Sequence, residues 1–212
     1  MRRSSLLMIP LALGAVLGAT VAQAQSTCPT GLPPGVYCGS PDVAGAPAGT
    51  YTVDPSHAAI VAKVSHIGYS YSVFRFGKVT GSLDWNPAAP GSTKLTASVE
   101  TASIGTPVPG FPAELSGPQY LNSTKFPQAS FVSTAFHRLD ATHGKVDGQF
   151  TLLGVTRPMT FDVTLIGAGK GFGAPRMGVE ATSSLDPKAF GMPPFFVAPI
   201  QLVIDAEFQK AP

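Results

Sequence analysis

Alternation of apolar and polar positions is the main pattern along this chain from residue 51 onward. In "YTVDPSHAAIVAKVSHIG", residues 51–68, Ile60, Ala62 and Val64 alternate with other side chains on the opposite face. The same alternation recurs in four further segments: 94–100, 145–152, 159–165 and 200–208. A period of two residues predicts β-strands with one buried face, as in half-buried antiparallel sheets.

Three more apolar-rich segments, 73–85, 129–139 and 176–185, bring the expected number of strands to eight or nine. Gly, Pro and Asn residues separate them, which is typical of strand connections. Segment 110–122 lacks alternation, and its apolar spacing predicts one or two short helical turns. An all-β chain of this kind forms a sandwich or a barrel, and a barrel leaves no unpaired sheet edge.

A barrel of about eight strands holds either its own side chains or one small ligand. Phe is frequent, with 13 residues, whereas Trp occurs once. Several expected inward positions carry small residues, which either leave space or fit a narrow taper: Ala62, Ala97, Ala135, Gly148 and Ala181. Composition therefore leaves a filled and a hollow interior both open.

The first 24 residues have the features of a secretory signal peptide: a basic start, an apolar run and "AQA" before Gln25. Residues 25–49 are rich in Pro, Gly and Ala and predict an irregular lead-in. Residues 50–212 then form one β domain. Export places Cys28 and Cys38 in an oxidising compartment, so we expect a disulfide between them. The expected location is periplasmic or secreted.

Charge excludes nucleic acid as a partner. The full chain has 14 Lys+Arg and 12 Asp+Glu. Removal of the signal peptide takes away Arg2 and Arg3 and leaves a formal net charge of zero. Nucleic-acid binding needs clustered positive charge, and the sequence has no basic stripe.

Catalytic and metal-binding patterns are weak. His57 and His66 are nine residues apart, roughly 30 Å along one strand, and His137 and His143 add no converging ligand pattern. No G-x-S-x-G nucleophile motif occurs. The sequence therefore predicts no enzyme activity, no cofactor and no metal, and it favours binding in an apolar pocket.

The segment "KAFGMPPFFVAP", residues 188–199, is too apolar for an ordinary exposed loop. It should cover the end of a core, a ligand or a partner. A filled barrel that binds a protein or a membrane surface through 188–199 is therefore the alternative to a ligand-binding barrel. A transient membrane contact and a homodimer are the further partners that the sequence leaves open.

Several motifs resemble the YceI-like family of polyisoprenoid-binding proteins. The opening segment is similar to the family pattern Y-x-h-D-x-x-H followed by V-x-H-h-G, where h is apolar. "FRFGKVTGSLDWNP", "ELSGPQYLNSTKFPQASFVS" and "LDPKAFGM" resemble further family segments, and "VDGQFTLLGVTRPMTFDVTLIGAG" resembles the G-V-T-R-P signature. The resemblance runs from Tyr51 to Phe208. It implies an eight-stranded antiparallel lipocalin-like barrel with an elongated apolar cavity for an isoprenoid-type lipid, in carriage or storage.

This resemblance, together with the alternation, defines the expected site. The expected cavity-lining residues are Ile60, Val64, His66, Phe76, Leu83, Phe131, Phe150, Phe161, Met177, Phe190, Phe195 and Phe196. Phe111, Phe190, Phe195 and Phe196 are expected to form a lid, with His57 and Arg157 as polar groups near the mouth. Departures from the family pattern at Gln119, Asn122 and "PPFFVAPI" make the mouth less charged and favour a neutral headgroup.

Overall fold

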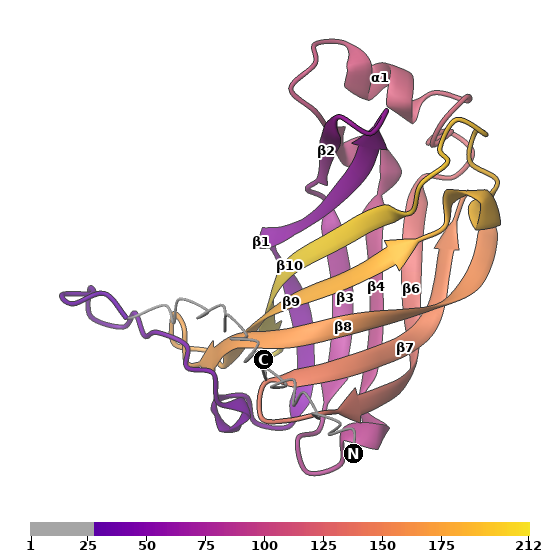
Figure 1. The fold of residues 1–212 in the computed structure, drawn as a ribbon. Helices are drawn as coiled ribbons and strands as arrows, with labels where there is room; N and C mark the ends of the chain where they lie inside the picture. The colour runs from indigo at the N-terminus through magenta and orange to yellow at the C-terminus, as the bar shows by residue number, and fades with distance from the viewer. Residues whose placement is uncertain (1–27) are drawn as a thin grey trace, which may run out of the picture.

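The computed structural model describes residues 28–212, so the predicted signal peptide, residues 1–24, lies outside the described part. Most of the described chain is β-structure (Figure 1). The strands are β1 (Gly49–His66), β2 (Ser70–Phe76), β3 (Val79–Trp85), β4 (Lys94–Glu100), β5 (Ile104–Gly105), β6 (Gln128–Arg138), β7 (His143–Leu152), β8 (Val155–Gly169), β9 (Arg176–Leu185) and β10 (Ile200–Lys210). The helical elements are α1 (Phe111–Ser116) and the 3-10 turns η1 (Val43–Gly45), η2 (Pro90–Ser92), η3 (Thr101–Ser103) and η4 (Pro187–Phe190).

Eight strands close into an antiparallel barrel, which confirms the predicted fold class. The ring runs β1-β3-β4-β6-β7-β8-β9-β10 and closes through β10 pairing with β1. β1 is long enough to change partner: residues Gly49–Thr52 pair with β3, whereas Ile60–His66 pair with β2. The β1–β2 hairpin therefore extends the wall beyond the ring, and β2 pairs further with the short β5.

Three register shifts change which side chains point inward, one of them in β8 between Leu165 and Gly167. In β1 the pairing with β10 shifts between Val53 and Ala58, and in β6 the pairing with β7 shifts between Ser133 and Ala135. The extra residue in β6 reverses the alternation, so Phe136 pairs with inward Val146. Ala135 pairs with Asp147 on the outer face, and the expectation that Ala135 points inward was wrong.

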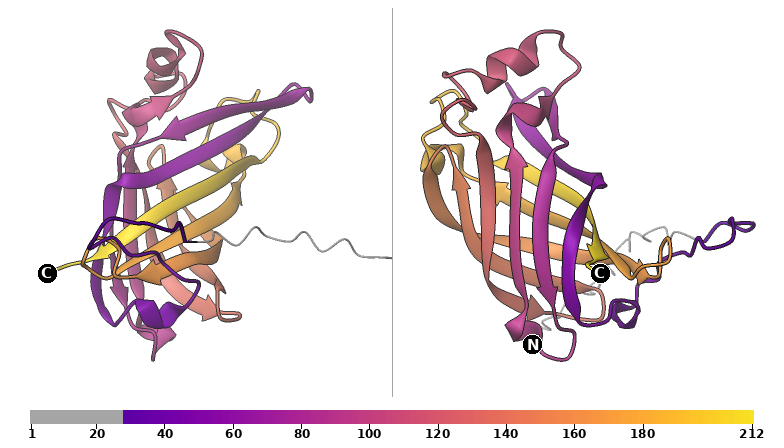
Figure 2. Two further views of the ribbon diagram at one scale, coloured as in Figure 1. Left: turned by 90° about the vertical axis from the view of Figure 1, so that its left-hand side faces the viewer. Right: turned by 180° about the vertical axis from the view of Figure 1, so that it is seen from behind.

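The barrel has two different ends (Figures 1 and 2). We call one the lid end; it comprises the β1–β2 hairpin, segment 100–128 with α1, the β7–β8 turn and segment 185–200. The other, the turn end, comprises the β3–β4, β6–β7 and β8–β9 connections and the lead-in. None of the helices in residues 28–212 is long and apolar enough to cross a membrane.

The lead-in packs against the turn end. The expected disulfide between Cys28 and Cys38 is present. Ser40 pairs with Ala168 of β8, and the indole Nε1 of Trp85 donates a hydrogen bond of 2.9 Å to the carbonyl of Ala46. Because Ala46 is almost fully buried, this segment closes the turn end of the barrel.

Candidate functional site

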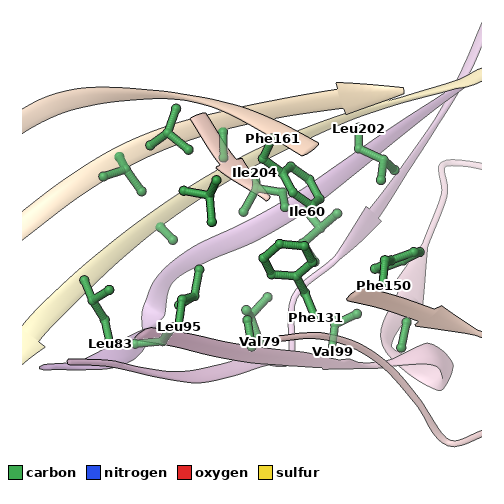
Figure 3. Close-up of a pocket in the computed structure, with 18 of the residues that line it drawn as sticks. Ile60, Val79, Leu83, Leu95, Val99, Phe131, Phe150, Phe161, Leu202 and Ile204 are labelled. Carbon is green, nitrogen blue, oxygen red and sulfur yellow. The ribbon is translucent and has the colours of Figure 1, made fainter. Parts of the chain in front are cut away.

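A cavity of about 340 Å³ runs through the barrel. Its walls are apolar side chains from all eight strands of the ring, and Figure 3 shows hydrocarbon side chains from opposite walls pointing into one space. Trp85, Pro87 and Pro90 line the turn end, and Leu115 and Met192 line the lid end. The volume lies in the range of about 300–1,000 Å³ that is usual for small-molecule pockets.

Small residues create this space. Ala62, Ala97 and Ala181 line the cavity, where larger side chains would fill it. Gly148 serves a different purpose, because the ring of Phe131 lies directly over its Cα. The ring then packs edge-on against Phe161, with 5.1 Å between the ring centroids. Phe131 thus lies against the wall instead of crossing the lumen, and the interior stays partly hollow.

Nine of the twelve side chains expected to line the cavity do so. They are Ile60, Val64, Phe76, Leu83, Phe131, Phe150, Phe161, Met177 and Phe196. For the eight that lie in strands, alternation was sufficient to identify the inward face, whereas Phe196 lies in the connection between β9 and β10. Whether they contact a ligand remains a prediction.

The other three side chains lie outside the lining. His66 is exposed where β1 ends, because the hairpin extends beyond the ring. Phe190 is buried behind the wall, edge-on to Phe150 at 5.5 Å between centroids. Phe195 is 60% exposed and lies on the outer side of Phe196, at 4.5 Å between centroids.

The lid is built from more residues than the sequence indicated. Phe111 packs against Phe74 of β2, at 6.2 Å between ring centroids, and so holds α1 over the barrel. Leu115, Tyr120, Leu121 and Met192 line the cavity beneath it. For Leu115, Tyr120 and Leu121 the signal was the apolar spacing of segment 110–122, and for Met192 it was the apolar segment 188–199. Alternation could not assign any of them an inward face because they are not in strands.

Polar groups of the lining are satisfied or confined to one end. The hydroxyl of Thr101 donates to the carbonyl of Phe126 at 2.8 Å. The charged side chains of the lining, Arg138, Asp140 and Lys145, belong to the β6–β7 hairpin at the turn end. Backbone N–H groups of Thr142 and His143 hold the pKa of Asp140 at about 2. The deep part of the cavity therefore offers a ligand mainly hydrocarbon contacts.

Of the two polar residues predicted near the mouth, Arg157 lies at the lid end and His57 does not. Arg157 is exposed at the β7–β8 turn of the lid end and is not part of the lining. His57 lies in the bulge of β1, and its Nδ1 is 3.0 Å from Asp54 Oδ2. Arg157 therefore lies at the predicted end of the barrel but outside the lining, whereas His57 lies on the outer wall and away from the mouth.

His57 belongs to an ion cluster on the outer wall. Ligand atoms of Asp54, His57 and Glu207 lie within 4.8 Å of one another, a spacing that could hold a metal ion. However, Arg176 Nη1 is 2.7 Å from Asp54 Oδ2 and 3.1 Å from Glu207 Oε2. The guanidinium occupies the cationic position between the two carboxylates, so the cluster serves to join β1, β9 and β10.

This cluster should make stability depend on pH. Hydrogen bonds from His57 and Arg176 lower the pKa of Asp54 to about 2. Because its folded pKa lies below the unfolded value, its contribution is complete above about pH 4 and is lost as the pH falls toward 2. We expect Asp54→Asn to lower stability at pH 7 and to reduce the loss between pH 5 and about 2, as measured by urea unfolding.

Asp205→Asn, on the exposed outer face of β10, is the matched control and should leave the pH profile unchanged. Asp140 and Asp147, whose pKa values are also lowered by hydrogen bonds, account for the acid dependence that remains. If the free energy of unfolding of Asp54→Asn varied with pH in parallel with that of the parent protein, the cluster would contribute nothing to the acid dependence of stability.

A known family matches nearly the whole barrel, whose strands span residues 49–210. The model of the family described as "YceI-like domain" matches residues 51–208. A UPF0312 protein from Pseudomonas putida strain W619 is 35% identical over 148 residues, covering 68% of this chain and 77% of that protein.

Two solved structures share the fold. Burkholderia cenocepacia BcnA superposes with a TM-score of 0.66 and 18% identity, covering 73% of this chain and 98% of that one. A polyisoprenoid binding domain from Saccharophagus degradans superposes with a TM-score of 0.57 and 11% identity, covering 76% of this chain and 98% of that one. At these identities the structural likeness establishes the fold, and the sequence matches establish the relationship.

Proposed function

This chain belongs to the YceI-like family, and on that premise we propose that it is a binding protein whose barrel holds one isoprenoid-type hydrocarbon chain. The observation that carries the proposal is the continuous apolar cavity between the two ends of the barrel. Burial of a hydrocarbon chain there is favourable by about 25 cal/mol per Å² of apolar surface and needs no charged contact. A binding role is therefore consistent with the absence of charged groups from the deep part of the described lining.

The likeness to the Saccharophagus domain supports the choice of an isoprenoid ligand, since that protein is described as polyisoprenoid-binding. The branched methyl groups of an isoprenoid chain also suit walls that mix small residues, such as Ala62 and Ala97, with aromatic rings. We infer a neutral headgroup, because Tyr120, Met192 and Phe196 close the cavity at the lid end, and the basic side chains of that end lie outside the lining.

The proposal is one of binding, with no chemical step. It includes carriage or storage outside the cytoplasm, which the disulfide between Cys28 and Cys38 supports. The homodimer remains a prediction that analytical ultracentrifugation would test.

Calorimetric titration with geraniol, farnesol and geranylgeraniol tests the ligand class. Affinity should rise by roughly tenfold or more with each added isoprene unit until the cavity is full, with a negative heat-capacity change. Straight-chain alcohols of matched carbon number are the control for shape, and prenyl phosphates are the control for the headgroup. Equal affinity for all chain lengths would contradict binding in the cavity, and tighter binding of the phosphates would contradict a neutral headgroup.

The alternative is an interaction module that acts through segment 188–199. The exposure of Phe195 and Val197 favours a surface contact there, but the hollow interior does not fit a barrel whose core is filled. Prenol titration separates the two, because the interaction module would show no dependence on chain length.

A further inference from the structure

The lid end carries apolar side chains that a monomer in water does not need. At the tip of the β1–β2 hairpin, Ile67 is 82% exposed and Tyr69 is 89% exposed. In segment 185–200, Phe195 is 60% and Val197 is 75% exposed. The two groups lie at the same end of the barrel (Figures 1 and 2), where Gln201 of β10 pairs with Lys63 of β1.

The hairpin tip also breaks a conformational preference. Ile67 has a φ of 52° and Gly68 a φ of 78°, and the N–H of Tyr69 donates to the carbonyl of His66 at 3.0 Å. Asn or Asp is usual at the first of these positions, because a β-branched residue is strained in the left-handed region. An exposed, strained isoleucine does not stabilise the fold, which points to a role in contact with another molecule.

Phe195 connects the exposed residues with the cavity. Phe195 stacks on Phe196, and both rings contact Tyr120 edge-on, with centroid distances of 5.9 and 6.4 Å. Phe196 and Tyr120 line the cavity. A hydrocarbon chain that entered between these rings would pass from the exposed patch into the lumen without crossing a polar surface.

Charge at the lid end is predominantly positive. It holds six basic residues, Lys63, Arg75, Lys78, Lys125, Arg157 and Lys188, and three acidic ones, Glu100, Glu114 and Asp186. The rest of residues 28–212 has the opposite balance, with six basic and nine acidic residues. A positive rim around apolar tips complements the surface of an anionic bilayer.

We propose that the lid end docks on an anionic lipid bilayer through Ile67, Tyr69, Phe195 and Val197, and that the lipid ligand enters the cavity there. The apolar tips would insert at the level of the headgroups, with the basic side chains around them at the membrane surface. The docking orients the lid toward the source of the ligand. This inference rests on the proposed binding function and adds the surface from which the ligand is taken.

Co-sedimentation with phosphatidylcholine–phosphatidylglycerol vesicles tests the docking. Ile67→Asn with Tyr69→Ser, and Phe195→Ser with Val197→Ser, should each lower the vesicle partition coefficient by about tenfold. Ile67→Asn suits the left-handed backbone, so the hairpin variant should melt no lower than the parent protein. Raising the salt concentration or omitting phosphatidylglycerol should weaken the binding of the parent protein as well.

Val132→Ser with Leu139→Ser is the control, since both residues are exposed apolar side chains, at 51% and 61%, that lie away from the lid end. Its partition should stay within about twofold of the parent value. Unchanged partition of both lid-end variants, or an equal loss in the control, would overturn the docking. Binding only to vesicles that contain membrane proteins would overturn it in favour of a protein partner.

Prenol titration of the same variants separates this inference from the proposed function. The hairpin variant, Ile67→Asn with Tyr69→Ser, should bind dissolved prenol as the parent protein does, because both residues lie outside the lining. Prenol binding without vesicle binding would remove the docking and leave the function. Vesicle binding without prenol binding would leave the docking surface but remove the ligand and its route of entry.

Discussion

Replacing Ala97 and Ala181 together with phenylalanine should abolish tight prenol binding while the barrel remains folded. The two residues line the cavity from β4 and β9, which lie on opposite sides of the ring. If the new rings displace about 100 Å² of buried apolar ligand surface, the binding free energy weakens by roughly 2.5 kcal/mol, which is close to a hundredfold in affinity. Calorimetric titration with geranylgeraniol measures the effect.

Ala59→Phe is the control, because Ala59 lies on the outward face of β1, between inward Ala58 and Ile60. It introduces the same side chain and should leave the affinity within about twofold of the parent value. If the double variant folds and still binds geranylgeraniol as tightly as the parent protein, the ligand does not occupy the lumen.

Gly148→Ala should be the most destabilising single methyl addition in the barrel wall. The added Cβ would collide with the ring of Phe131 and lie 2.5 Å from the carbonyl oxygen of Val132. The ring can turn, but the carbonyl belongs to the backbone of β6, so the β6–β7 pairing must shift. We expect a loss of about 2–4 kcal/mol in the free energy of unfolding, measured in urea.

Gly178→Ala in β9 is the matched control, since its added Cβ would meet no atom closer than 3.8 Å. It should change stability by less than about 0.5 kcal/mol or increase it. Phe131→Leu in the Gly148→Ala background should restore only part of the loss, because the contact with the backbone remains. Full restoration would mean that the ring alone opposes the methyl group.

Alternation predicted the strands well because one face of each strand is buried in the barrel. The expected alternating segments 94–100 and 200–208 fall within β4 and β10, and the helical turn within segment 110–122 is α1. Segment 73–85 was expected to be one strand, but Gly77 and Lys78 divide it into β2 and β3. A two-residue break leaves little trace in hydrophobic alternation, because apolar residues flank it on both sides.

The inward face beyond a bulge could not be predicted. The extra residue between Ser133 and Ala135 depends on how β6 pairs with β7, and a single strand carries no record of its partner. A shift of one residue exchanges the two faces, so Phe136 replaced Ala135 inside the barrel. The lining was predicted where strands run regularly, as for Phe150 and Phe161, but of the lining residues in the connections that supply the lid only Phe196 was named.

The size of the cavity could not be predicted from the sequence either. Ala62 and Ala181 were identified as inward, but small residues either widen a lumen or fit a narrow one. The outcome depends on where the large rings lie, and the position of Phe131 over Gly148 is a contact between strands. Side-chain volume alone therefore could not distinguish a hollow from a filled interior.

Native mass spectrometry of the protein purified from its own host tests the central claim most directly. An occupied apolar lumen predicts an added mass of lipid size that organic extraction removes, and that is absent from the Ala97→Phe, Ala181→Phe variant purified in the same way. A folded protein that shows only the mass of its own chain, before and after extraction, would contradict the claim that the barrel carries a hydrocarbon ligand.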